Sequence, residues 1–90
     1  MNTQQILENL LELLENNNVE VRKESISGGS GGLCKIKGKY TFFADTKSSS
    51  FETAVNCAKA AARIVDLDSI YIRPEVREFI EKYGDGTGGE

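Results

Sequence analysis

Leu33-Cys-Lys-Ile-Lys-Gly-Lys-Tyr-Thr-Phe-Phe-Ala-Asp45 is the stretch that decides the fold of this 90-residue chain. Short runs that contain β-branched and aromatic residues flank Gly38, which is typical of β-strands. We expect strands at 33–37 and 39–45. Lys37-Gly38 suits a two-residue hairpin turn, in which the glycine supplies a positive φ angle.

The register of this hairpin determines which side chains share a face. A two-residue turn places one set on one face (Cys34, Ile36, Thr41, Phe43) and a second set on the other (Lys35, Tyr40, Phe42). A three-residue turn would exchange Phe43 for Phe42. We expect the face with Cys34 to point into the core, and the sequence leaves open which phenylalanine accompanies it.

The segments around the hairpin predict helices and one further strand. Leucines recur at three- and four-residue steps over 4–17, which indicates an amphipathic helix. Alternating apolar and charged residues over 19–24 indicate a half-buried strand. A second helix over 50–66 begins at a capping box formed by Ser49 and Glu52. A third helix follows Pro74, which suits a first helical position, and runs to Tyr83.

These elements define an α+β fold in the order α-β-β-β-α-(β)-α. The bracketed strand is the short apolar segment 70–72, which is predicted to be a strand or an extended link. We expect one domain over 1–84, with helices packed on a mainly antiparallel sheet of three to four strands. The polar, glycine-rich end, 85–90, has nothing to bury and is expected to be disordered.

The composition excludes several classes of chemistry. The chain has no histidine, so Ser–His–Asp and Cys–His mechanisms and histidine-based zinc sites lack an essential part. Two cysteines cannot close a structural zinc site. The net charge of −3 disfavours attraction to DNA or to anionic lipid. We therefore expect no metal, no cofactor, no DNA partner and no membrane partner.

The same composition suits a cytoplasmic protein. The first twenty residues show neither a basic region followed by an apolar run nor a transmembrane pattern, because three glutamates interrupt the leucines. Cys34 and Cys57 are expected to stay reduced and unbridged.

Three groups of residues are candidates for binding. Glycines at 28–32, among them Gly29, Gly31 and Gly32, expose backbone amides that can cradle an anion. A strand follows them, however, where a phosphate loop requires a helix N-terminus. Lysines and aromatics of the hairpin form a basic, aromatic pattern that single-stranded RNA binders use, although an RNP signature is missing and RNA is disfavoured. These candidates are Lys35, Lys37, Tyr40 and Phe42, together with Arg73 as a reader of carboxylate or phosphate.

Two further constellations have simpler explanations. The lysines beside Cys34 would favour its reactive thiolate, but strand alternation sends them to the opposite face, so a packing cysteine is the expected role. Asp45, Asp66 and Asp68 match no EF-hand spacing, and capping or turn roles explain Asp66 and Asp68.

The motifs G-G-L-C-K-I-K-G (31–38) and I-Y-I-R-P (70–74) resemble those of a group of short bacterial proteins of uncharacterised function. The resemblance covers most of 4–83 and implies a bacterial cytoplasmic protein with a common fold, but no activity. The element order is also similar to the front half of small regulatory metallopeptidases. Their zinc helix carries H-E-x-x-H, whereas this chain reads A-V-N-C-A-K-A-A-A-R over 54–63, which implies neither zinc nor hydrolysis.

The sequence thus predicts a non-enzymatic protein-interaction module that associates with itself as a homodimer, since the small core leaves apolar faces to cover. One alternative is a binder of small anions, nucleotides or RNA that uses the glycine-rich loop and the basic hairpin. A third hypothesis is thiol chemistry at Cys34.

Overall fold

The computed structural model describes residues 1–25 and 32–84. Three helices and a three-stranded sheet make an α+β fold, as expected. In chain order the elements are α1 (Thr3–Asn16), β1 (Glu20–Glu24), β2 (Gly32–Ile36), β3 (Lys39–Asp45), α2 (Ser50–Ile64) and α3 (Pro74–Tyr83).

Helices α1 and α2 begin at capping boxes, and the one of α2 is the box that the sequence predicts. The Asn2 side chain accepts a hydrogen bond from the Gln5 amide at 2.8 Å, and the Gln5 side chain accepts one from the Asn2 amide. Ser49 and Glu52 form the expected capping box of α2. These reciprocal bonds satisfy amides that a helix start leaves without partners. After α1, Asn18 takes a left-handed φ of 66°, which asparagine tolerates and which turns the chain into β1.

The sheet is mixed, with the strand order β1-β3-β2. β2 and β3 form the predicted antiparallel hairpin, and Lys37 (φ 52°) and Gly38 (φ 81°) supply its two-residue turn. β1 pairs with β3 in parallel, so the expectation of a mainly antiparallel sheet holds for only one of the two pairings. The predicted strand at 70–72 is absent from the described part of the chain, where these residues form an extended link to α3.

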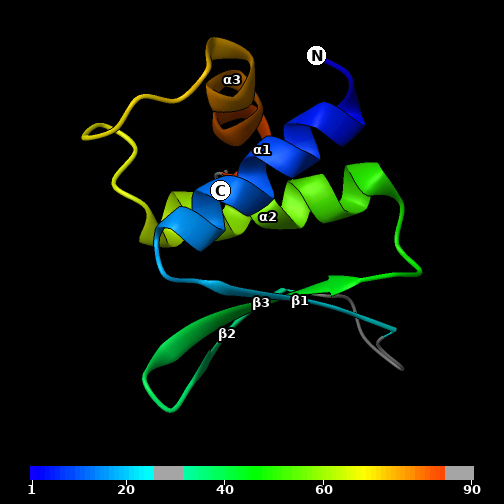
Figure 1. Cartoon of the computed structure of the whole chain (residues 1–90). Helices are drawn as coiled ribbons and strands as arrows, with labels where there is room; N and C mark the ends of the chain where they lie inside the picture. Colours follow the sequence, from blue (N-terminus) through cyan, green and yellow to red (C-terminus); the bar gives the residue numbers. More distant parts are fainter. Residues whose placement is uncertain (26–31, 85–90) are drawn as a thin grey trace.

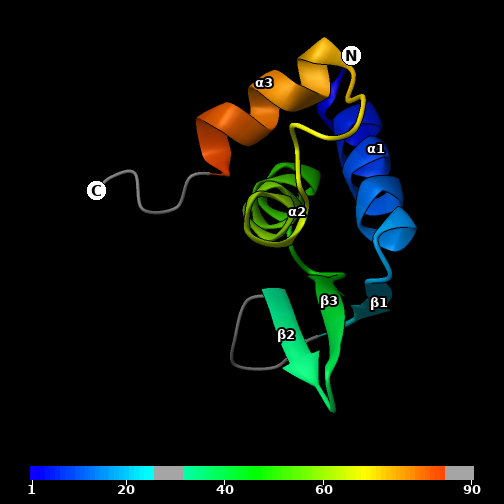
Figure 2. The same ribbon diagram turned by 90° about the vertical axis from the view of Figure 1, so that its left-hand side faces the viewer.

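The molecule has three layers (Figure 1). α1 and α2 lie side by side on one face of the sheet, and α3 packs across them on the side away from the strands. Figure 2 shows α2 above β2 and β3, with α1 above β1. Small side chains let the helices approach closely. The buried residues that α2 contributes to the single core are Thr53, Ala54, Cys57, Ala58, Ala60 and Ala61.

The link between α2 and α3 is held by Arg77. Its guanidinium donates to the Leu67 carbonyl at 3.0 Å and to the Asp68 carboxylate at 2.9 Å, and it also pairs with Glu81 at 3.3 Å. These bonds raise the pKa of Arg77, chiefly through the hydrogen bond to Asp68. Asp66 accepts from the Asp68 amide, which is the turn role expected of it. The predicted tail at 85–90 lies outside the described residues.

Candidate interaction surface

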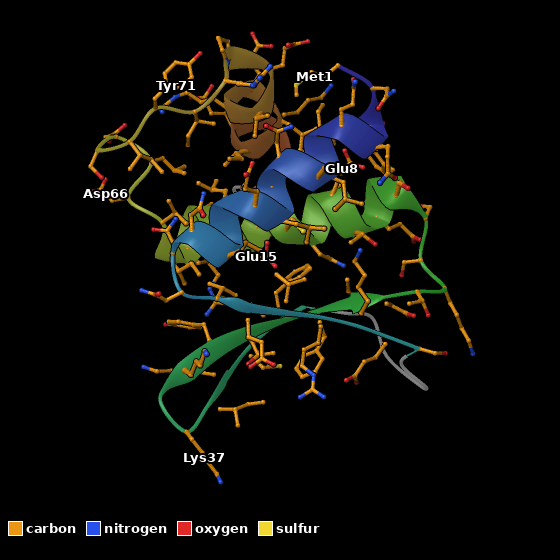
Figure 3. The ribbon with its side chains drawn as sticks, in the orientation of Figure 1. Met1, Glu8, Glu15, Lys37, Asp66 and Tyr71 are labelled. Carbon is orange, nitrogen blue, oxygen red and sulfur yellow. The ribbon has the colours of Figure 1, made fainter. Side chains whose placement is uncertain are left out.

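No helix among residues 1–25 and 32–84 covers one face of the sheet, and we call this face the open face. Because side chains alternate along a strand, the strand registers assign every position to a face. Phe42 lies on the helix side, with Val21 and Leu33 as its neighbours on β1 and β2. The side chains on the open face project away from the helices (Figure 3). They are Glu20, Arg22 and Glu24 of β1, Lys39, Thr41, Phe43 and Asp45 of β3, and Gly32, Cys34 and Ile36 of β2.

The open face is divided into a charged half and an apolar half. On β1, Arg22 pairs with Glu24 at 3.1 Å, and both side chains remain about half exposed. An exposed pair of this kind contributes about 0–1 kcal/mol. The other half carries Gly32, Cys34, Ile36 and Phe43, which we call the β2 strip, with Lys39 and Thr41 beside them on β3. Ile36 is 48% exposed and Phe43 is half-buried, so this strip still presents apolar surface to solvent.

The β2 strip adjoins a strand edge that pairs with no other strand of the described residues. Ile36 and Lys39 flank the two-residue turn and exchange hydrogen bonds. The alternation of an antiparallel ladder then makes Cys34 and Thr41 the next bonded pair. It follows that the amides and carbonyls of Leu33 and Lys35 point away from β3. No backbone group in the described part of the chain bonds them from that side. Such an edge can accept another strand.

The two edge strands of the sheet, β1 and β2, differ in how strongly their charges discourage pairing with another chain. β1 reads Glu-Val-Arg-Lys-Glu, so four of its five side chains are charged. Charges on an edge strand discourage pairing with other chains. β2 carries one charged side chain, Lys35. The Lys35 ammonium lies 5.3 Å from the ring centroid of Tyr40, on β3. That cation–π contact directs the charge toward β3, away from the free edge.

The two cysteines have opposite environments, and the expectation for Cys34 is wrong. Both are free, but Cys34 is exposed and Cys57 is buried. Cys34 shares a face with Ile36 as predicted, yet this face is the open one, because the helices cover the face of Phe42. Burial raises the pKa of the Cys57 thiol to about 12, since the thiolate would lose its hydration there.

The residues predicted to form one binding site are dispersed. Phe42 is fully buried under the helices, so its expected place on an accessible face is wrong, and Tyr40 on the same side is half-buried. Lys35 borders Tyr40, and Lys37 lies at the tip of the hairpin. Arg73 precedes α3, beyond the helix layer. Figure 3 shows this separation, with Lys37 at one end of the molecule and Tyr71 at the other. Gly32 begins β2, whereas Gly29 and Gly31 lie outside the described residues.

Among the cavities that the described residues line, two lie between packed elements away from the open face. The first, about 220 Å³, lies between α1 and the start of α3 and has Glu12 and Arg73 on its walls. The second, about 200 Å³, lies where α1 and α2 meet the ends of β1 and β3, beside Lys23 and Thr53. Both are smaller than the roughly 300–1,000 Å³ of most ligand pockets.

The remaining exposed aromatic and acidic side chains of the described residues form no binding site. Phe51 is 45% exposed, but its ring packs edge-on against Tyr83, with the centroids 5.2 Å apart, and joins α2 to α3. Within residues 1–25 and 32–84, no three acidic or sulfur ligands gather as a metal site. In the same residues, no helix combines the length and apolarity needed to cross a bilayer.

The chain matches no protein-family model, no curated protein and no solved structure. The resemblance carried by 31–38 and 70–74 therefore stays a prediction, and the function is inferred from the geometry of the surface.

Proposed function

We propose that this protein is a non-enzymatic interaction module that binds a protein partner through the β2 strip and the adjoining edge. The observation that carries the proposal is the coincidence of two features on one strand. β2 presents free backbone donors and acceptors at its edge and apolar side chains on the open face. Strand addition uses both, since main-chain bonds supply affinity and alternate side chains supply specificity.

The energetics of the surface favour a partner. Ile36 is 48% exposed and Phe43 is half-buried, and covering apolar surface of this kind contributes roughly 25 cal/mol per Å². Each hydrogen bond made by Leu33 or Lys35 adds about 0.5–1.5 kcal/mol net, because water already satisfies these groups in the free chain. A partner strand gains both contributions, whereas a small polar ligand gains neither the apolar contact nor a run of backbone bonds.

The alternative, a binder of small anions, nucleotides or RNA, has less support. Its aromatic platform required Phe42 on the surface, and the helices cover that side chain. Arg73 precedes α3, which lies on the other side of α1 and α2 from the hairpin (Figure 1), so Arg73 and the hairpin lysines do not converge on one ligand.

We place the interaction in the bacterial cytoplasm. The support is the sequence resemblance of the hairpin and the exposure of Cys34, a free thiol that a reducing compartment keeps intact.

Site-specific photo-crosslinking in the native host tests this function. A photoreactive amino acid at position 36, on the open face, is compared with one at Lys59, an exposed position on α2. We expect a discrete crosslinked species from position 36 and none from position 59. The same experiment in a Lys35→Pro background, which removes an outward N–H, is expected to lose the species. Equal crosslinking from both positions, or none from position 36, contradicts the proposal.

A further inference from the structure

We infer that the partner of β2 is β2 of a second copy of this chain. The two strands run antiparallel about a two-fold axis at Cys34 and join the two sheets into one of six strands. This inference rests on the proposed function and specifies its partner. The axis stands perpendicular to the sheet, so the helices of both copies lie on the same side and the two open faces become continuous.

The free backbone groups select the register. In an antiparallel pair, residues whose amides and carbonyls point outward must lie opposite each other. On β2 these residues are Leu33 and Lys35, which allows three registers. Pairing Lys35 with Lys35 sets like charges opposite and aligns only residues 34–36, whereas pairing Leu33 with Leu33 aligns only 32–34. Pairing Leu33 with Lys35 aligns all five residues of both strands and places Cys34 opposite itself.

The side chains on the open face complement one another in this register. Ile36 of one copy comes to lie opposite Gly32 of the other, where no atom lies within 4 Å of the position that a Cβ would take. Gly32 pairs with Phe43 inside its own sheet. The exposed Ile36 side chain can therefore lean across the glycine toward the Phe43 ring of the second copy. This contact occurs twice by symmetry and covers the apolar half of each open face.

The charges favour a closed dimer over a growing sheet. Each Lys35 lies opposite Leu33, and its ammonium is already drawn over Tyr40 of its own chain. After pairing, the outer edges of the six-stranded sheet are the two β1 strands. Their charged side chains oppose further strand addition, so association stops at two copies.

The mass of the purified protein under reducing conditions gives the first test. Sedimentation or light scattering is expected to give twice the chain mass of 9.9 kDa at high micromolar concentration. Lys35→Pro removes the outward amide without breaking a bond to β3, because proline is tolerated where the N–H faces away from the sheet. We expect it to weaken dimerisation about 10–100-fold, since two symmetric hydrogen bonds are lost. Lys35→Thr, the matched control, keeps the amide and the dimer.

Charge exchange at the axis gives a second test that does not depend on proline. Cys34→Arg and Cys34→Asp change an exposed position, so each variant is expected to fold, as checked by circular dichroism. Either variant alone places two like charges opposite each other at the axis, so each is expected to be monomeric. An equimolar mixture is expected to restore a heterodimer, because only an axis at position 34 sets the arginine opposite the aspartate.

The outcomes separate this inference from the function on which it rests. A monomeric wild-type chain, or a mixture of the two charge variants that stays monomeric, overturns the β2 homodimer. The proposed interaction then still stands if photo-crosslinking at position 36 yields a species with a mass other than twice that of the chain. Loss of that crosslink contradicts both.

Discussion

Gly84 lies against the main chain of Ala58, so closely that a Cβ on Gly84 would be 2.7 Å from the Ala58 carbonyl oxygen. The same Cβ would be 2.5 Å from the carbonyl oxygen of Ile80. Gly84 ends α3 with an ordinary right-handed conformation, φ −82°, which any residue can adopt. The glycine is therefore needed for a close approach between α3 and α2 rather than for a left-handed cap.

Gly84→Ala is expected to lower the free energy of unfolding by about 1–3 kcal/mol, because the backbone atoms it meets cannot move aside as a side chain can. Urea denaturation measures the change. Gly32→Ala is the control, since its Cβ would meet no atom within 4 Å. The measurement is made at low micromolar concentration, where association contributes least. An equal loss in both variants contradicts the close approach.

The two neighbouring phenylalanines of β3 are expected to differ in their effect on stability. Phe42→Ala empties a fully buried site and is expected to cost about 3–5 kcal/mol. Phe43→Ala removes a half-buried ring from the open face and leaves no closed cavity, so its cost is expected to be clearly smaller. Thermal or urea unfolding of both variants makes the comparison. A larger loss for Phe43→Ala would reverse the assignment of the faces.

Thiol labelling is expected to distinguish the two cysteines. In the folded protein one equivalent of a thiol reagent reacts rapidly, at the exposed Cys34, and the second reacts only after denaturant exposes Cys57. Mass spectrometry of the labelled peptides identifies the site. Cys34→Ser is the control and should leave no rapid phase. Rapid labelling of Cys57 in the native state would contradict its burial.

The stability of the protein is expected to fall in alkali through Cys57. Its folded-state pKa, about 12, lies above the value of 9.0 for an unperturbed thiol. Below pH 9 the thiol is neutral in both states, and the burial of Cys57 carries no ionic cost. As the pH rises from 9 toward 12, the unfolded chain loses this proton first, so folding becomes less favourable by about 1.4 kcal/mol per pH unit at most.

Comparison with Cys57→Ala isolates this effect from the titration of lysines and tyrosines. Urea unfolding at several pH values between 8 and 11 should show a shallower decline for the variant. The variant loses some core packing at every pH, so the slope, rather than the stability itself, is the readout. Identical slopes would show that Cys57 does not contribute.

Arg77→Gln is expected to loosen the link between α2 and α3. The substitution removes the charged bonds to Asp68 and Glu81, and the shorter glutamine side chain lacks the Nη1 group that donates to the Leu67 carbonyl. Hydrogen exchange should accelerate at Ser69, whose amide bonds to Asp66 inside this link. Arg63→Gln, at an exposed position near the end of α2, is the control and should leave the exchange at Ser69 unchanged.

The sequence by itself determined the local elements, but it left two registers open for the hairpin. The capping box of Ser49 and Glu52 predicted the start of α2, because it satisfies amides that only a helix start leaves free. Lys37-Gly38 suited a two-residue turn, and the structure selects that turn over the three-residue alternative, so that Cys34 lies with Phe43 on one face and Phe42 lies on the other. These features depend on contacts between residues a few positions apart.

Only the tertiary structure decided which of those faces is buried. A period of two groups side chains by face, but Phe42 and Phe43 put one aromatic ring on each, so the pattern cannot say where the helices pack. The helices pack on the face of Phe42, Val21 and Leu33. The parallel pairing of β1 with β3, between segments some twenty residues apart, adds Val21 to that face and so makes it more apolar. That packing exposed Cys34 and Ile36 and created the surface proposed for binding.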